Sequence, residues 1–382
     1  MKKRNMFKFL VVCAVMTLFF VMAPWIPASS AADMADDGYP VPRVVTDRAI
    51  KVGYITEIPQ NESTIRWIRQ HHIEAAHRGW DFVFVPVNRA GDLVREAMIN
   101  LINQEVDAII LNNLPMEPLA DLIIQARQEG IGVYNNDSQL MGGCITNATM
   151  PNGVTSMEMF YLVGNLMKWN ANILFNNLRA LQVHPERADP AIALCGRAYP
   201  GMIMLDEQDV ELAGAAHTQQ VYDFTRVWLT RFGEEIDVIF CTWDGAAAGA
   251  AEAIIASGIE KEILVTGIDG GSRTWAYIRD PNSPFKYSYA QPFELYTHKL
   301  CKLIDQLQVE GLQPGDPDVE LTSYGTILYS QGIIVGPNNV PEVGQSIHSV
   351  FNYYGGDPGD PDAWYNWQEA GGPYIITDGT ED

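Results

Sequence analysis

Basic residues are scarce in this chain of 382 residues, where 25 Lys and Arg stand against 47 Asp and Glu and leave a formal net charge of −22. A surface with this charge repels phosphate backbones and anionic membranes, so we expect no nucleic-acid partner. Cysteine is also scarce, because five in this length do not make a disulfide scaffold. We favour buried free thiols over disulfide bridges for Cys144, Cys195, Cys241 and Cys301.

Motifs for catalysis and for metal or phosphate binding are missing. The densest group of potential metal ligands, HHIEAAH at 71–77, has no His-Glu-x-x-His pattern and no evident third ligand, so we expect an exposed helix face there. The Gly-rich turn at 267–273 lacks both the Gly-x-Ser-x-Gly elbow of serine hydrolases and the Lys of a phosphate-binding loop. The acids at 357, 360 and 362 fail the EF-hand spacing. We therefore expect no enzymatic activity, no metal site and no cofactor.

The first 32 residues have the order of a signal peptide. Three basic residues at 2–4 precede a mostly apolar run at 9–25, and small residues follow at 28–32. We expect cleavage after Ala31 or Ala32, which places the mature chain in the periplasm or outside the cell envelope. The alternatives are an uncleaved anchor, because the run is near the lower limit for a spanning helix, and a lipoprotein attached at Cys13, which lacks the usual small residue before it.

From residue 49 onward, short β-branched and apolar runs alternate with amphipathic segments of helical length. We predict strands at 50–55, 81–87, 108–111 and 132–134, and helices at 63–78, 92–104 and 116–129. Three strand–helix units in succession predict a parallel sheet with helices on both faces.

The same alternation resumes after an irregular stretch at 138–152 and predicts a second α/β lobe. Its helices are expected at 154–181 (either continuous or broken near Trp169), 207–232 and 246–257, and its strands at 191–194, 238–240 and 263–266. A helix at 292–310 and strands at 326–328 and 332–335 are too few to enclose a core, so they must pack on the existing lobes. The tail from residue 355 is rich in Gly, Pro, Asp and aromatics, and we expect it to be solvated and partly ordered.

Polar and aromatic side chains follow the predicted strands. Ligands of open parallel sheets bind beyond the carboxyl ends of the strands, and carboxylates, amides and aromatic faces suit a small polyhydroxylated ligand. For any single Asp or Asn, capping of the next helix is the simpler interpretation, and we assign that role to Asp244. Only the joint pattern on both lobes favours a binding site. Its candidate residues are Gln60, Asn61, Asn112, Asp137, Arg197, Tyr199, Trp243, Asp269 and Gln291.

Two segments resemble type I periplasmic sugar-binding proteins of the ribose-binding kind. They are 51–137, which ends in GIGVYNND, and 237–291, which contains DVIF, GIDG and a final AQ. The resemblance assigns ligand contacts to Asn112, Asp137, Asp269 and Gln291, with Trp243 where the family often has Asn. Gln60 and Asn61 replace the paired aromatics that often follow the first strand, and Arg197 is the candidate for the arginine of the second lobe.

The resemblance implies an α/β fold of two Rossmann-like, doubly wound parallel-sheet lobes joined by a hinge of three crossings, near residues 147, 291 and 330. We expect 33–48 to form an N-terminal extension, 49–146 with 292–330 the first lobe, 147–291 with 331–354 the second, and 355–382 an acidic tail. The implied ligand is a sugar or similar polyol, bound in the interlobe cleft by a monomeric receptor.

The implied partner is the permease of an ABC transporter, to which the receptor would deliver its ligand. The alternative is a sensory receptor that presents its closed form to a membrane kinase or chemoreceptor. A repressor with the same fold is set aside, because no helix-turn-helix precedes residue 49. A secreted enzyme remains a third class, with no residues to support it.

Overall fold

The computed structural model describes residues 34–58, 61–88, 91–211, 216–345, 347–357 and 359–367. The predicted signal peptide and the candidate residue Gln60 lie outside these ranges. Within them, no helix combines the length and the apolar character that a membrane span requires.

The first lobe is built on a parallel six-stranded sheet with the strand order β11-β5-β4-β3-β1-β2. Its strands are β1 (Lys51–Glu57), β2 (Asp81–Val87), β3 (Ala108–Asn112), β4 (Gly132–Asn136), β5 (Thr146–Thr149) and β11 (Thr326–Tyr329). β3 and β4 are buried on both faces, which explains why the sequence AIIL at the start of β3 is apolar throughout rather than alternating.

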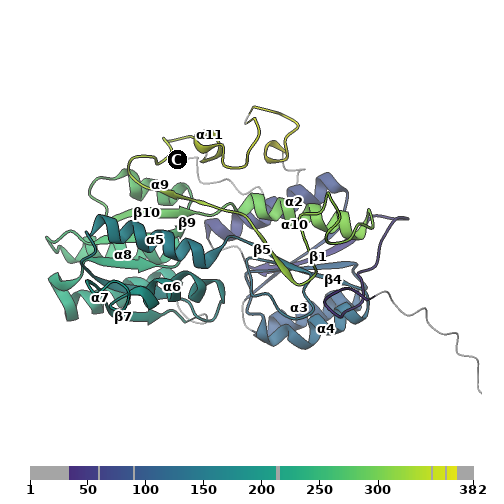
Figure 1. The fold of residues 1–382 in the computed structure, drawn as a ribbon, viewed down its shortest axis with the longest axis horizontal. Coiled ribbons are helices and arrows are strands. Elements are labelled where there is room, and N and C mark those ends of the chain that lie inside the picture. Colours follow the sequence, from purple (N-terminus) through teal and green to yellow (C-terminus); the bar gives the residue numbers. More distant parts are fainter. Residues whose placement is uncertain are drawn as a thin grey trace, which may run out of the picture. The chain divides into compact units, whose positions relative to one another are not determined.

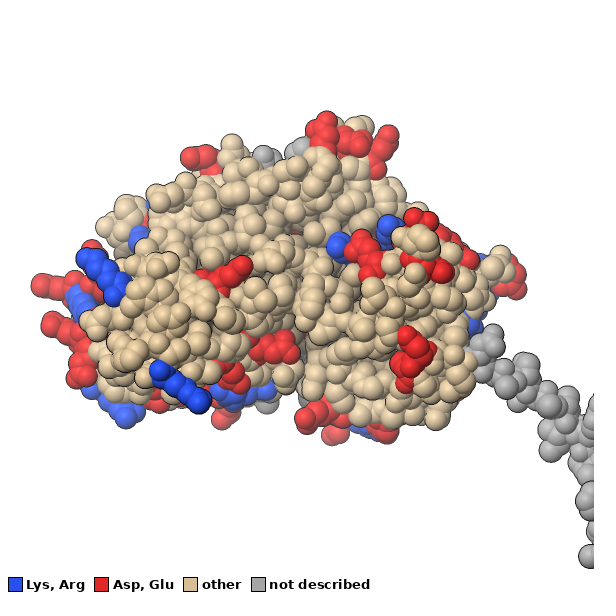
Figure 2. All heavy atoms as spheres, viewed as in Figure 1, with Lys and Arg blue, Asp and Glu red and all other residues tan. Residues whose placement is uncertain are grey.

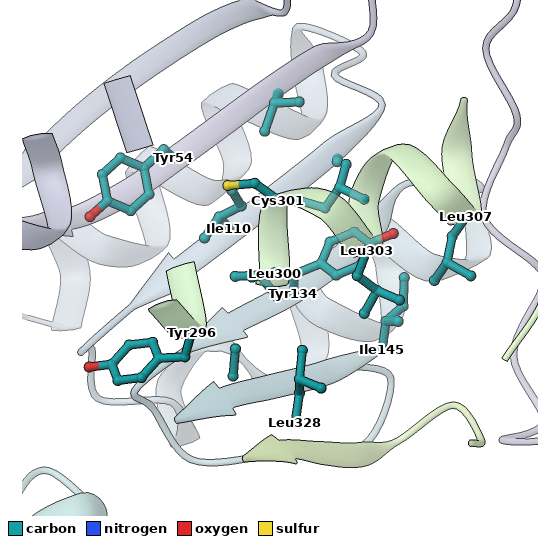
Figure 3. Packing of buried hydrophobic residues seen from close by; sticks show 14 of the residues in the cluster. Tyr54, Ile110, Tyr134, Ile145, Tyr296, Leu300, Cys301, Leu303, Leu307 and Leu328 are labelled. Carbon is teal, nitrogen blue, oxygen red and sulfur yellow. The ribbon is translucent and has the colours of Figure 1, made fainter. Parts of the chain in front are cut away.

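Helices cover both faces of this sheet. α2 (Glu62–Arg78) and α10 (Phe293–Gln308) lie on one face, and α3 (Gly91–Asn103), η1 (Glu117–Leu119) and α4 (Ala120–Gln128) lie on the other (Figure 1). Figure 3 shows the first layer, in which Leu300 and Leu303 of α10 lie near Tyr134 of β4 and Ile145, which directly precedes β5. α10 thus belongs to this lobe although it follows most of the second lobe in the sequence.

The second lobe has its own six-stranded sheet, with the order β12-β10-β9-β8-β6-β7. Its strands are β6 (Ala171–Asn177), β7 (Met202–Asp209), β8 (Val238–Cys241), β9 (Leu264–Asp269), β10 (Phe285–Ala290) and β12 (Ile333–Val335). Only β12 runs antiparallel to its neighbour among these described pairings. The helices α5 (Asn152–Leu166) and α6 (Val183–Leu194) pack on one face, and α7 (His217–Phe232) and α8 (Asp244–Ser257) pack on the other.

The chain passes from one sheet to the other in three short segments. They connect β5 to α5, β10 to α10, and β11 to β12. Both lobes fall within one compact unit of the chain, Ala35–Asp382. The predicted fold class, two α/β lobes with doubly wound sheets, is confirmed. The predicted lobe boundary after residue 146 falls inside β5, so the first crossing lies a few residues later than expected.

Three predicted elements of the second lobe are wrong. The helix predicted at 154–181 ends at Leu166, and its second part forms β6. The strand predicted at 191–194 is the last turn of α6, and the helix predicted from residue 207 begins only at His217, because 202–209 form β7. The boundary between α5 and β6 is made by Lys168 and Trp169, which adopt left-handed φ values of 53° and 60° without a glycine to mark the turn.

The histidine-rich segment of α2 does not form the exposed face that its pattern predicts. His71 and Glu74 are fully buried, and His71 stacks on Tyr54 with ring centroids 4.0 Å apart. Burial lowers the pKa of His71 to about 4. Glu74 pairs with Arg78 at 3.0 Å and with His298 at 2.8 Å, so these side chains form part of the α2–α10 packing. No group of three potential metal ligands occurs in the described ranges.

The four cysteines of the described residues are free thiols. Three are buried and Cys195 is half-buried. Burial raises the pKa of the Cys144 and Cys241 thiols to about 12. These thiols therefore behave as small apolar core residues.

Charge is distributed over both lobes on the face that Figure 2 shows. Asp and Glu lie scattered with Lys and Arg among them, and much of the surface between carries no charge. Local ion pairs join opposite charges, such as Arg95 with Asp121 at 2.5 Å and Lys261 with Asp237 at 2.7 Å. Pairs that are open to solvent, such as Arg95 with Asp121, contribute little to stability.

Candidate functional site

A cavity of about 330 Å³ lies between the two lobes. Both sheets point the carboxyl ends of their strands toward it, as open α/β sheets do at their ligand sites. The first lobe contributes Glu57, Asn61, Glu62, Ser63, Trp67, Asn113 and Asp137. The main polar and aromatic residues from the second lobe are His184, Arg187, His217, Thr218, Trp243, Asp244, Glu252, Asp269, Arg273, Thr274 and Tyr277.

Three of the cavity residues have a strained backbone. Asn113 follows β3, Asp137 follows β4 and Asp269 ends β9, and their φ values are 49°, 46° and 144°. Residues other than glycine rarely adopt positive φ, and such strain is concentrated at ligand clamps and active sites. The turns at these strand ends therefore aim polar side chains into the cavity at a cost in backbone energy.

A buried arginine links the two lobes. Arg187, on α6 of the second lobe, is 2% exposed and its Nη2 lies 3.2 Å from Oδ2 of Asp137 in the first lobe. Within its own lobe it donates to Oδ1 of Asn152 at 2.8 Å and to the carbonyl of Thr242 at 3.2 Å, and it lies 3.7 Å from Asp269. The guanidinium thus satisfies two carboxylates that would otherwise be costly to bury.

Asp269 makes a second link between the lobes. Its Oδ2 accepts a hydrogen bond from the Ser63 hydroxyl of the first lobe at 2.9 Å, and its Oδ1 accepts one from Nε2 of Gln291 at 2.7 Å. Burial raises the pKa of Asp269 to about 6, although Arg187 opposes that shift. The Asp269 carboxylate is therefore held beside the cavity with a pKa raised toward neutral pH.

Asp244 does not cap α8 as the sequence predicts. The residue before the helix is Trp243, whose side chain makes no capping hydrogen bond, and Asp244 is the first helical residue. Its carboxylate accepts hydrogen bonds from the Gly270 amide at 2.8 Å, the Thr274 hydroxyl at 2.6 Å and the Ser288 hydroxyl at 2.7 Å. Burial, followed by the charge of Asp269, raises the pKa of Asp244 to about 7.

Four of the predicted residues meet at the cavity: Asn61, Asp137, Trp243 and Asp269. Asn61 also caps α2, because its Oδ1 accepts the Thr64 amide at 2.9 Å. Trp243 packs edge-to-face with His184, with ring centroids 5.3 Å apart. The cavity therefore combines acceptors from both lobes with an indole surface.

Asn112 and Gln291 lie behind the cavity wall. Oδ1 of Asn112 accepts hydrogen bonds from the hydroxyls of Tyr54 and Thr56, both at 2.8 Å, and its neighbour Asn113 lines the cavity instead. Gln291 is fully buried and orients Asp269. Among the described residues, Oδ1 of Asn113 and Oε1 of Gln291 are buried acceptors without a hydrogen-bond partner.

Arg197 and Tyr199 lie away from the cavity. They precede β7 instead of following a strand, so they sit at the amino end of the second sheet. Arg197 is exposed, and Tyr199 stacks on Trp169 with centroids 4.4 Å apart. Their prediction depended on a strand at 191–194 that is helix in the structure. The buried arginine that reaches the cavity is Arg187, and no motif in the sequence indicates it, His184 or Trp67 as cavity residues.

Residues 72–308, more than half of the chain, match the family described as the periplasmic binding protein domain. This chain is a member of the periplasmic binding protein family. The ribose import binding protein RbsB of Bacillus subtilis (strain 168) is 25% identical over 215 residues. That match covers 54% of this periplasmic binding protein and 65% of the relative, slightly less than two thirds of its length.

Solved structures show the same fold at low sequence identity. A 5-methylthioribose transporter solute-binding protein from Thermotoga lettingae, solved with 5-methylthioribose, has a TM-score of 0.71 at 15% identity, over 87% of this chain and 98% of its own. An ABC transporter solute-binding protein from Agrobacterium vitis with bound allitol has a TM-score of 0.67 at 18% identity, over 76% and 97%. The fructose-binding periplasmic domain of a hybrid two-component system has a TM-score of 0.65 at 18% identity, over 76% and 92%.

Proposed function

We propose that this periplasmic binding protein captures a small, uncharged polyhydroxylated ligand, a sugar or similar polyol, in the interlobe cavity and delivers it to an ABC importer. The observation that carries the proposal is the convergence of acceptors from both lobes on one cavity, with Asp137 and Asn113 on one side and Asp269 on the other. Each hydroxyl of a polyol can donate to one such acceptor, while the Trp243 indole covers apolar C–H groups.

The charge of the cavity supports an uncharged ligand. Arg187 is already engaged by Asp137 and Asp269, and further carboxylates line the cavity at Glu57 and Glu62. A phosphate or carboxylate on the ligand would meet these acids. Arg273 also lines the cavity, but it is exposed, so its guanidinium would offer an anion only a solvent-screened partner. The volume of about 330 Å³ lies at the small end of the range for ligand sites, which suits a monosaccharide-sized molecule.

Contacts between the lobes support a clamp mechanism. Glu62 of the first lobe accepts the amide of Ser272 in the second at 2.6 Å, and Arg66 donates to the carbonyl of Gly270 at 2.6 Å. Together with the Arg187–Asp137 pair, these contacts belong to a closed form, and the short crossings allow rigid-body opening. Small-angle scattering should show compaction when the ligand saturates the protein, and an unchanged curve would argue against a clamp.

A thermal-shift screen of the exported protein tests the ligand class. The panel contains pentoses, hexoses and linear and cyclic polyols, each with a matched phosphorylated or carboxylated derivative. We expect an uncharged member of the panel to raise the melting temperature and its anionic derivative to leave it unchanged, because a ligand that binds the folded state stabilises it. Stabilisation only by anionic members would contradict the proposal.

A sensory receptor is the second candidate, since the same fold occurs in the fructose-binding domain of a two-component system. The two roles differ in the membrane partner. Deleting an importer permease encoded beside this chain should abolish uptake of the ligand if the protein serves transport. Uptake that persists, together with loss of a ligand-induced transcriptional response when the chain is deleted, would assign it to sensing.

A further inference from the structure

The segment that follows β12 packs first on the second lobe. We define the C-terminal strap as the described residues from 340 to 367, which include α11 (Ile347–Phe351) and η3 (Trp364–Asn366). Phe351 and Tyr353 of the strap pack with Trp275 of α9 (Ser272–Arg279) and with Ala290 of β10. The Tyr353 hydroxyl also donates to the carbonyl of Ala290, at the end of the strand that enters the hinge.

The end of the strap then packs on the first lobe. Trp364 stacks on His298 of α10, with ring centroids 4.4 Å apart and planes inclined by 9°. Trp367 stacks on His77 of α2, with centroids 4.0 Å apart and planes inclined by 10°. Figure 1 shows the C-terminal segment with α11 running along the side of the molecule that carries α9, α2 and α10. The strap is thus a connection between the lobes in addition to the three hinge segments.

One strap residue also reaches the contacts that close the lobes. The Tyr354 hydroxyl donates to Oε2 of Glu294 at 2.7 Å, and Glu294 holds the Arg66 guanidinium through bonds of 2.6 and 2.8 Å. Arg66 donates in turn to the carbonyl of Gly270 in the second lobe. Glu294 lies next to the hinge crossing, so Tyr354 supports the side chain that orients a closing contact.

We propose that the C-terminal strap is a latch that favours the closed form of the clamp and so regulates ligand release. Opening separates α9 from α2 and α10. Because the strap adheres to elements of both lobes, that motion breaks its contacts with one of them, either the ring stacks on His77 and His298 or the packing on α9. The ring stacks on His77 and His298 therefore stabilise the closed form relative to the open form. This inference rests on the proposed clamp function but needs no knowledge of the ligand.

Amide hydrogen exchange at the start of α9 reports the closed form directly. The first amides of a helix have no acceptor within the helix, and those of Ser272 and Arg273 instead donate to Glu62 of the opposite lobe, at 2.6 and 3.4 Å. Their protection therefore depends on closure. Exchange is measured by mass spectrometry on the ligand-free full chain for the wild type and for the double variant Trp364→Ala/Trp367→Ala.

We expect the double variant to accelerate exchange at Ser272 and Arg273 by roughly tenfold, which corresponds to two lost aromatic stacks. The matched control is Tyr199→Ala, which removes a stack on Trp169 within the second lobe and should leave these amides as in the wild type. Amides in the centre of β3 should exchange slowly in every variant and show that the lobes stay folded.

Wild-type exchange at the two amides in the double variant would overturn the latch, as would an equal acceleration in Tyr199→Ala. If the double variant does not fold, the same exchange measurement is made on Tyr354→Phe. This variant removes only the hydrogen bond to Glu294 and keeps the ring. Faster exchange at the two amides supports the latch, and unchanged exchange overturns it. No ligand is present in this experiment, so a failed sugar screen would leave its result intact.

Discussion

Replacing Arg187 by Met removes the only described cation within 4 Å of Asp137 and Asp269 while keeping an apolar stem of similar length. Asp137 is 1% exposed and Asp269 14% exposed, so water cannot replace the guanidinium fully while the lobes stay closed. The variant also leaves Oδ1 of Asn152 and the carbonyl of Thr242 without their donor. Removing one partner of a buried ion pair costs about 3–5 kcal/mol of unfolding free energy.

A double-mutant cycle separates the ion pair from general damage to the core. Asp137→Asn keeps the side-chain volume and removes the charge, so the double variant Arg187→Met/Asp137→Asn no longer buries an unpaired carboxylate at that position. We expect it to recover about 1–3 kcal/mol relative to the sum of the single variants. Asp269 remains uncompensated, so recovery should be partial.

Urea unfolding at pH 7.5, followed by circular dichroism, measures both effects through the midpoint and the slope. A midpoint in Arg187→Met within error of the wild type would refute the argument, because it would mean that the two carboxylates do not need the guanidinium. If the two single variants' changes in unfolding free energy simply add in the double variant, the pairing of Arg187 with Asp137 is refuted in particular.

The remaining predictions concern pH, ligand contacts and the hinge. Because the pKa of Asp244 is raised to about 7, the folded chain binds its proton more tightly than the unfolded chain, and stability should fall as pH rises from about 4 through 7. Asp244→Asn should lose part of this slope in urea midpoints at pH 5 and 8, and an identical slope would contradict the burial argument. Asp137→Ala and Asp269→Ala should each weaken binding of the ligand found in the screen by about 2 kcal/mol or more, since charge-assisted hydrogen bonds are strong. Asp244→Ala should lower the free energy of unfolding more than the affinity for the ligand. If calorimetry shows that Asp244→Ala loses affinity while Asp137→Ala and Asp269→Ala bind as the wild type does, the roles assigned to these three residues are wrong. Gly332→Ala places a Cβ against the carbonyl oxygen of Ala290 beside the hinge, so unfolding free energy should fall by about 1–3 kcal/mol. If Gly332→Ala has the urea midpoint of the wild type, the hinge segment can shift to accommodate the added Cβ, and the prediction is wrong.

The first lobe could be predicted closely because each of its elements carries its own signal. The strand at 81–87 matches β2 to the residue, and Gly79 and Gly130 mark the ends of helices with left-handed turns. In the second lobe, the turn after α5 is made by Lys168 and Trp169, which carry no turn signal, and α6 contains Pro190 in its interior. A proline there favours a helix end, and the apolar run that follows it at 191–194 is typical of a strand, although it forms the last turn of α6.

That single misassignment accounts for the main error at the site. With a strand placed at 191–194, the side chains at the expected carboxyl end are Arg197 and Tyr199, and Arg187 falls in a connecting segment. Asp137, Trp243 and Asp269 were predicted because their strands have clear apolar runs that end in polar residues. The choice of Asn113 over Asn112 depends on a left-handed turn after β3, and the two adjacent asparagines are equally suited to such a turn.

The central claim is that the interlobe cavity holds an uncharged polyhydroxylated ligand. A crystal structure of the protein grown with the strongest stabilising member of the screen tests it most directly. The account predicts electron density in the cavity, with ligand hydroxyls within hydrogen-bond distance of Asp137, Asn113 and Asp269 and an apolar face against Trp243. Density for the ligand at a site outside the residues that line this cavity would contradict it.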